Sequence, residues 1–108
     1  MNISALPKDA DGLIAFAESI ATALAEKLEQ LGIATEVEAP LRTAIAGAAS
    51  AGDEYVAALA HAEKSAQARS FLADAKRRRD RSLEQLRRRV TRSIRHLGRL
   101  SEEESINH

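Results

Sequence analysis

Glycine and proline are scarce in this chain, and their scarcity limits the possible folds more than any other feature. The 108 residues include five glycines and two prolines, too few turn-forming residues for a fold of many strands. Alanine, which favours helices most strongly, occupies 22 positions. We therefore expect an all-α protein with a single small domain.

The residue types that are missing exclude several kinds of chemistry. Without cysteine, the chain has no disulfides, no thiolate catalysis and no cysteine-based zinc site. Aromatic residues make up 3% of the chain and tryptophan is absent. This argues against an aromatic core and against a platform on which nucleobases stack.

The first periodic segment predicts a helix over residues 10–31. Asp9 and Asp11 are candidate N-cap residues, and Gly32 follows at the position where a left-handed residue often ends a helix. Apolar residues recur at steps of three and four, which places them on one helix face: Leu13, Phe16, Ala17, Ile20, Leu24, Leu28 and Leu31.

A second helix is predicted over residues 36–69. Its start resembles a capping box, with Thr35 and Glu38 three positions apart, and Pro40 falls in the first turns. Steps of four and three then give heptad spacing through Leu41, Ile45, Ala48, Gly52, Tyr55, Leu59, Ala62 and Ala66. Small side chains fill half of these positions, so a partner helix can approach closely. We define Ala48, Gly52, Tyr55, Leu59 and Ala62 as the seam, and expect the protein to self-associate through it as coiled coils do.

A third helix is predicted over residues 71–98, ending at Gly98. Its apolar stripe comprises Leu72, Leu83, Leu86, Val90, Ile94 and Leu97. Continuing the heptad spacing from the second helix would bury Arg69, Lys76, Asp80 and Arg87, so the helix register must change near Ser70, a candidate N-cap. Alternatively, the second and third helices form one continuous rod of roughly 93 Å, which a partner chain would have to cover.

These segments predict an antiparallel bundle of three helices within a domain of residues 1–100. Residues 101–108 are rich in glutamate and are expected to form a mobile acidic tail.

Several of these segments also resemble a loosely defined group of Ala-rich bacterial helical proteins that has no established activity. The resemblance covers about residues 10–98 and is carried by Leu13-Ile14-Ala15-Phe16-Ala17, by the turn Leu31-Gly32-Ile33, by the Ala-rich second helix and by the last helix ending at Ile94–Leu97. It implies a helical bundle and supplies no catalytic or binding residues. The chain departs from that group in its last helix, which is rich in arginine where alanine and leucine are usual.

The charges are strongly segregated along the chain, although the formal net charge is zero. Residues 76–99 carry a net charge of +9, against −6 for residues 1–75 and −3 for residues 100–108. On a helical wheel, six arginines fall on one side, opposite the apolar stripe, with Arg78 and Arg89 beside them. We call these six the arginine ridge: Arg77, Arg81, Arg88, Arg92, Arg95 and Arg99.

The ridge has three interpretations. It can bind the phosphates of a nucleic acid or another polyanion, since guanidinium groups grip phosphate in a bidentate way. It can be a solvated face without a ligand. It can also meet acidic groups of another subunit, for which the candidates are Glu18, Glu26, Glu29, Glu36 and Glu38.

No arrangement typical of an enzyme is apparent. His61, His96 and His108 lack the Glu-x-x-His spacing of a di-iron bundle, and no phosphate-binding glycine loop or nucleophile–base pair is present. His61 is expected on the flank of the bundle, and His96 lies beside arginines that disfavour a cation or a metal. We predict no catalytic, cofactor-binding or metal-binding residues and no small-molecule substrate.

The sequence therefore predicts a non-enzymatic structural or protein-interaction module that self-associates or binds a protein partner. The alternative is nucleic-acid binding without sequence preference through the arginine ridge. No targeting signal or membrane-spanning stretch is found in the sequence, so a cytoplasmic protein is expected. Binding of the basic helix to a membrane surface is disfavoured because the core needs its apolar stripe.

Overall fold

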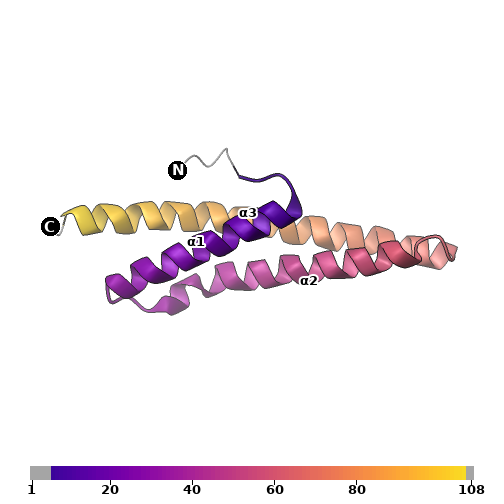
Figure 1. Ribbon diagram of the computed structural model, residues 1–108, viewed down its shortest axis with the longest axis horizontal. Helices are drawn as coiled ribbons and strands as arrows, with labels where there is room; N and C mark the ends of the chain where they lie inside the picture. The colour runs from indigo at the N-terminus through magenta and orange to yellow at the C-terminus, as the bar shows by residue number, and fades with distance from the viewer. Residues whose placement is uncertain (1–5, 107–108) are drawn as a thin grey trace.

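The computed structural model shows an all-α bundle of three helices. It describes residues 6–106, apart from the side chains of residues 35, 37 and 103–106. Helix α1 spans Ala10–Gln30, α2 spans Ala39–His61 and α3 spans Ala66–Ile106, while a short 3-10 helix, η2, spans Thr35–Glu38. Helices that follow one another in the chain run antiparallel (Figure 1). The predicted antiparallel bundle is therefore confirmed, and residues 6–106 contain no strand.

The two ends of α1 carry the local signals that the sequence predicts. The backbone N–H of Gly12 donates to Asp9 Oδ2 at 2.8 Å, so Asp9 is the N-cap. Gly32 has a positive φ of 70°. The N–H of Gly32 donates to the Glu29 carbonyl, and that of Ile33 to the Leu28 carbonyl, at 3.1 and 2.9 Å. This pair of bonds is a Schellman motif, which satisfies carbonyls that the helix end leaves unpaired.

Helix α2 begins three residues later than predicted. The residues assigned to a capping box form η2 instead, and α2 starts at Ala39 with Pro40 in its first turn. The Glu38 carboxylate does not cap the helix, because its Oε1 pairs with Arg42 Nε at 3.2 Å. Proline suits this position because the first helical N–H groups have no partner within the helix.

The break between the second and third helices is real, but it lies earlier than the sequence suggests. Helix α2 ends at His61 rather than residue 69, and α3 begins at Ala66 rather than residue 71. Ser65, not Ser70, caps α3, since its Oγ accepts from the N–H of Ala68 at 3.0 Å. The alternative of one continuous rod is therefore wrong.

Helix α3 does not end at Gly98. It continues to Ile106, so residues 101–106, predicted as part of a tail, prolong the helix instead. The reason is tertiary: Leu100 is buried against Leu24 and Leu28 of α1, which holds the helix in place beyond the glycine. Residues 107–108 of the predicted tail lie outside the described residues.

The main core forms where all three helices meet. Leu13, Ala17 and Ile20 of α1 pack with Leu86 and Val90 of α3 and with the first half of α2, which contributes Leu41, Ile45 and Ala48. The predicted apolar faces of the first and third helices thus form the core. At about 25 cal/mol per Å² of apolar surface removed from water, this burial is the main force that holds the helices together.

Helix α1 covers only part of the other two helices. The molecule is 64 Å long, and α3, with 41 residues, runs almost its whole length at ~1.5 Å per residue. Helices α2 and α3 continue past the start of α1 as a two-helix hairpin (Figure 1). We call residues 53–74 the hairpin end. In this part of the hairpin, Ala58 of α2 is buried, as is Ala75 of α3 just beyond it.

Candidate interaction surfaces

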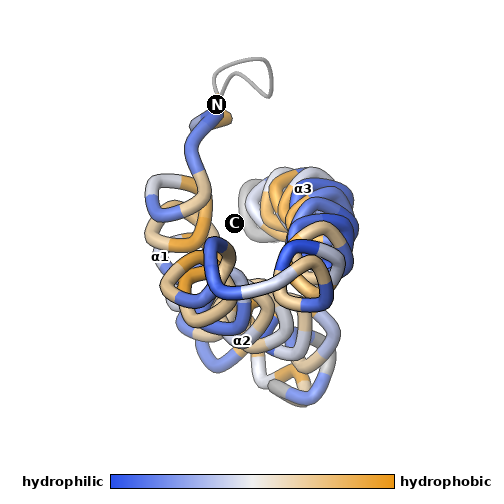
Figure 2. Tube along the Cα trace, turned by 90° about the vertical axis from the view of Figure 1, so that its right-hand side faces the viewer, coloured by the Kyte–Doolittle hydropathy of each residue, from blue (hydrophilic) through white to orange (hydrophobic). Residues whose placement is uncertain are grey.

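The arginine ridge lies on the outer side of α3. Its six members, Arg77, Arg81, Arg88, Arg92, Arg95 and Arg99, are all exposed. Figure 2 shows the hydrophilic side of α3 turned away from α1 and the apolar side turned inward. This arrangement follows from the wheel, because the ridge is opposite the stripe that α1 and α2 cover.

Most of the ridge has no acidic partner among the residues whose side chains are described. Arg77 pairs with Asp74, and Arg88 Nη2 pairs with Glu84 Oε1 at 2.7 Å. Both pairs are largely exposed, and such pairs contribute little to stability. The other four, Arg81, Arg92, Arg95 and Arg99, make no ion pair or hydrogen bond with any residue whose side chain is described. All four residues are exposed, and Arg81 lines a hollow together with Glu54.

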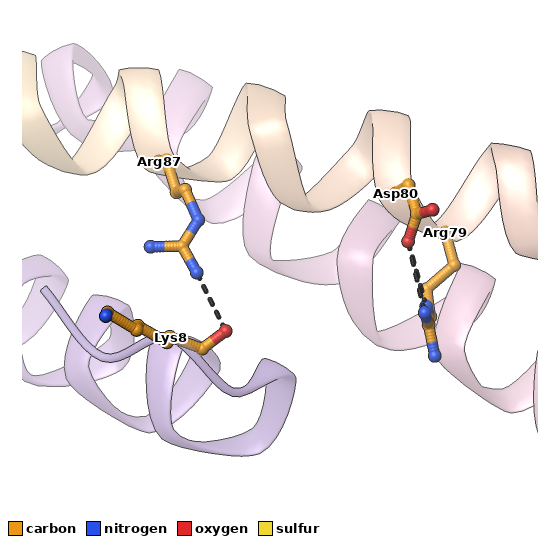
Figure 3. A network of polar contacts seen from close by, with 4 residues as sticks. All are labelled: Lys8, Arg79, Asp80 and Arg87. Carbon is orange, nitrogen blue, oxygen red and sulfur yellow. Dashed lines mark hydrogen bonds and ion pairs between the residues drawn. The ribbon is translucent and has the colours of Figure 1, made fainter.

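Two other arginines of the same helix have structural roles instead (Figure 3). Arg87 Nη2 donates to the Lys8 carbonyl at 2.9 Å, which ties α3 to the segment before α1. Arg79 pairs with Asp80 at 3.1 Å, and its guanidinium carbon lies 4.1 Å from the centre of the Tyr55 ring. That stacking is a cation–π contact between α3 and α2. Neither residue belongs to the ridge.

A basic groove runs between α2 and α3 beside the ridge. It has a volume of about 710 Å³, and its lining comprises Ala39, Pro40, Thr43, Ala44, Gly47, Ser82, Gln85, Arg88, Arg89 and Arg92. A smaller hollow of about 170 Å³ adjoins it and shares Pro40, Arg89 and Arg92, adding Ser93 and His96. Arg89, which the sequence places only beside the ridge, also has no partner among the described side chains.

The acidic groups predicted to meet the ridge of another subunit are mostly accessible. Glu18, Glu26 and Glu29 are exposed on α1, and Glu36 is exposed in η2. Glu38 is the exception, since it is half-buried and pairs with Arg42. The exposed glutamates lie on α1 and η2, whereas the ridge lies on α3. Contact between the glutamates of one copy and the ridge of another stays a prediction.

The predicted seam divides into parts with different environments. Ala48 is buried in the core of the same chain, so it contacts α1 and α3 rather than a second copy. Gly52, Tyr55 and Ala62 are half-buried, whereas Leu59 is 48% exposed. Ala48 therefore cannot contact a second copy, and the predicted self-association is confined to the later part of the seam.

The hairpin end carries large apolar side chains that the protein leaves in solvent. Val56 is 64% and Phe71 is 55% exposed, in addition to Leu59. Phe71 lies by the guanidinium of Arg78 and lines a hollow with Ala57 and His61. Neither Val56 nor Phe71 belongs to a predicted apolar face or to the predicted seam. Their exposure could have been predicted from the sequence, because Val56 is offset from the heptad spacing of the second helix and Phe71 from the apolar stripe of the third.

The two described histidines, His61 and His96, are not part of any group of side chains placed to hold a metal ion. His61 is exposed, His96 lines the small hollow with Arg89 and Arg92, and His108 lies outside the described residues. Within residues 6–106, no group of three histidine, cysteine, aspartate or glutamate residues is placed to hold a metal ion. The helices of this part of the chain also include none with the length and apolar character that a membrane span requires.

No protein-family model matches the chain, and neither the curated proteins nor the solved structures include a similar one.

Proposed function

We propose that the protein is a non-enzymatic interaction module that self-associates through its hairpin end. The observation that carries this proposal is the exposure of Val56 and Leu59 in the last turns of α2. Val56 borders a hollow with the first turn of α1. At ~100° per residue, Leu59 points in the same direction as Leu41, and Val56 lies within about 60° of it. The side of α2 that packs in the core thus continues into the hairpin end, where Val56 and Leu59 are exposed.

A second copy of the chain is the partner that this geometry favours. Two hairpin ends, laid against each other in opposite directions, would give a four-helix arrangement in which each Val56–Leu59 surface is covered by its counterpart. Such a two-fold interface needs only one self-complementary surface, and dimers of this kind are the commonest protein assemblies. Burying a leucine side chain contributes about 1.5–3 kcal/mol, and the interface would bury it twice.

The test is the mass of the protein in solution as a function of concentration. Sedimentation equilibrium should show the wild-type protein as a dimer, and Leu59→Glu should raise the dissociation constant at least tenfold, because it places a charge in the apolar contact. Ala46→Glu is the matched control, since Ala46 is exposed on α2 outside the hairpin end. A wild-type protein that stays monomeric, or an equal effect of both substitutions, would contradict the proposal.

A second candidate function is the binding of nucleic acid without sequence preference through the arginine ridge. It is supported by the four ridge arginines that have no partner among the described side chains, Arg81, Arg92, Arg95 and Arg99. The ridge extends for about 33 Å along α3 at ~1.5 Å per residue. That length is close to one turn of duplex DNA, about 34 Å.

Fluorescence anisotropy of labelled duplex and single-stranded DNA tests this candidate. We expect micromolar binding that weakens steeply with salt, with about six phosphates neutralised, because each contact releases counterions. Arg95→Gln with Arg99→Gln should lower the salt slope by about two contacts. Absence of binding at about 50 mM salt would leave the ridge as a solvated face or a protein interface.

A further inference from the structure

We propose that the groove between α2 and α3 is a discrete binding site for phosphate groups, held by Arg89 and Arg92 together with Arg88. The site goes beyond self-association, and it sharpens the second candidate function without depending on it. The ligand chemistry is a phosphate or diphosphate, whether free or part of a nucleic-acid backbone. The groove and its smaller neighbour are treated as one site because they share Pro40, Arg89 and Arg92.

Three basic side chains and no acidic one line the large groove. This distinguishes it from the other hollows that contain arginine. Arg79 shares its hollow with Asp9, Asp11 and Asp53, while Arg78 and Arg81 share theirs with Glu54. In those hollows a carboxylate of the same chain is part of the lining, whereas at the groove the acidic contact among the described residues is the exposed pair between Arg88 and Glu84, and Glu84 does not line the groove.

Pairing within the chain leaves the groove's positive charge largely uncompensated. Arg89 and Arg92 have no ion pair with any described side chain. Both side chains of the Arg88–Glu84 ion pair are highly exposed. Because such a pair contributes little free energy, Arg88 can leave Glu84 and turn toward an anion. Glu38 precedes α2, but it does not line the groove, and its carboxylate pairs with Arg42.

The neutral part of the lining also suits a phosphate. Thr43, Ser82 and Gln85 supply side-chain donors at the groove. The first residues of α2, Ala39 and Pro40, belong to the lining as well, so the positive end of the helix dipole lies at the site. Guanidinium groups hold phosphate oxygens with paired hydrogen bonds, which lysine cannot do.

The size of the groove sets the class of ligand. A volume of about 710 Å³ lies in the range of small-molecule sites and exceeds what a single phosphate needs. A diphosphate, or two adjacent phosphates of a nucleic-acid strand, can contact Arg88 and Arg92, one helical turn apart, together with Arg89 between them.

Isothermal titration with inorganic pyrophosphate tests the site directly. The wild-type protein should bind it, and the double variant Arg89→Gln/Arg92→Gln should bind at least tenfold more weakly. Arg95→Gln/Arg99→Gln is the matched control, because it removes the same charge from exposed positions of the same helix that do not line the groove. The control should change pyrophosphate affinity less than threefold. Circular dichroism of both variants verifies that the helices are intact.

The outcomes separate this inference from the two proposed functions. Equal losses in the two variants would show diffuse attraction along the ridge and overturn the site, as would a wild-type protein that does not bind pyrophosphate. DNA binding that survives while pyrophosphate binding fails would overturn the site and retain the ridge as a nucleic-acid surface. Binding of pyrophosphate without DNA would assign the site to a free phosphate compound. The self-association experiment depends on Leu59, which is not part of the groove.

Discussion

At the residue scale, a helix end could be predicted from the sequence where hydrogen bonds between neighbouring residues determine it. Asp9 and Gly32 act at the two ends of α1 as their positions in the sequence predict, because an N-cap and a left-handed residue need only their own neighbours. Gly98 also follows an apolar stripe, as Gly32 does, but α3 continues through it. Burial of Leu100 against α1 overrides it, and this contact joins residues that are far apart in the sequence.

The two glycines should therefore respond in opposite ways to alanine. Gly32→Ala should lower the free energy of unfolding by about 1 kcal/mol, because an L side chain disfavours the positive φ. Gly98→Ala should raise it by about 0.5–1 kcal/mol, since alanine is the better residue inside a helix. An added Cβ would meet no atom within 4 Å at either position, so packing does not obscure the comparison. Urea denaturation followed by circular dichroism, at one protein concentration, measures both changes. Destabilisation by Gly98→Ala would contradict a helix that continues through this position.

At the scale of elements, periodicity predicted the three helices and the buried faces of the first and third, but only the first part of the second helix's buried face, and it did not locate the break. Residues 62–65 contain neither glycine nor proline, and both Ser65 and Ser70 are plausible caps from sequence alone. The choice depends on how far α2 can pack against α3 before the chain turns. For the same reason, the length of α1 relative to the hairpin end could not be inferred from the spacing of apolar residues.

The position of the break predicts a difference between two serines. Ser65→Ala should lower the free energy of unfolding by about 1 kcal/mol, because it removes the acceptor for the N–H of Ala68. Ser70→Ala, at an exposed position inside α3, should leave stability unchanged or slightly raise it, since alanine has the higher helix propensity. Equal costs at the two positions would argue against Ser65 as the cap. Thermal or urea unfolding of the two variants provides the comparison.

At the scale of the whole molecule, the three helices leave two different surfaces uncovered. One is the apolar side of the hairpin end, which arises because α1 is shorter than the pair it covers. The other is the basic side of α3 with its groove, which carries most of the positive charge of the chain. The sequence predicted the arginine ridge residue by residue, because helix periodicity alone places its members on one side. The groove could not be predicted in this way, since its lining combines α2 and α3.

The proposed dimer also has a shape that distinguishes it from other ways of associating. Two copies that overlap only at their hairpin ends must be longer than one copy, whose length is 64 Å, and shorter than two copies end to end. Copies that associate side by side, with the acidic surface of α1 against the ridge, would retain nearly the length of one. Association driven by those charges would also weaken with salt, whereas apolar contact at the hairpin end would not.

Small-angle X-ray scattering of the wild-type protein over a concentration series tests this account most directly, since it gives mass and maximum dimension together. Self-association through the hairpin end predicts a particle of about twice the 11.7 kDa chain mass, with a maximum dimension clearly above 64 Å, both persisting at high salt. A particle of single-chain mass at all concentrations, or a dimer no longer than one chain, would contradict self-association through the hairpin end.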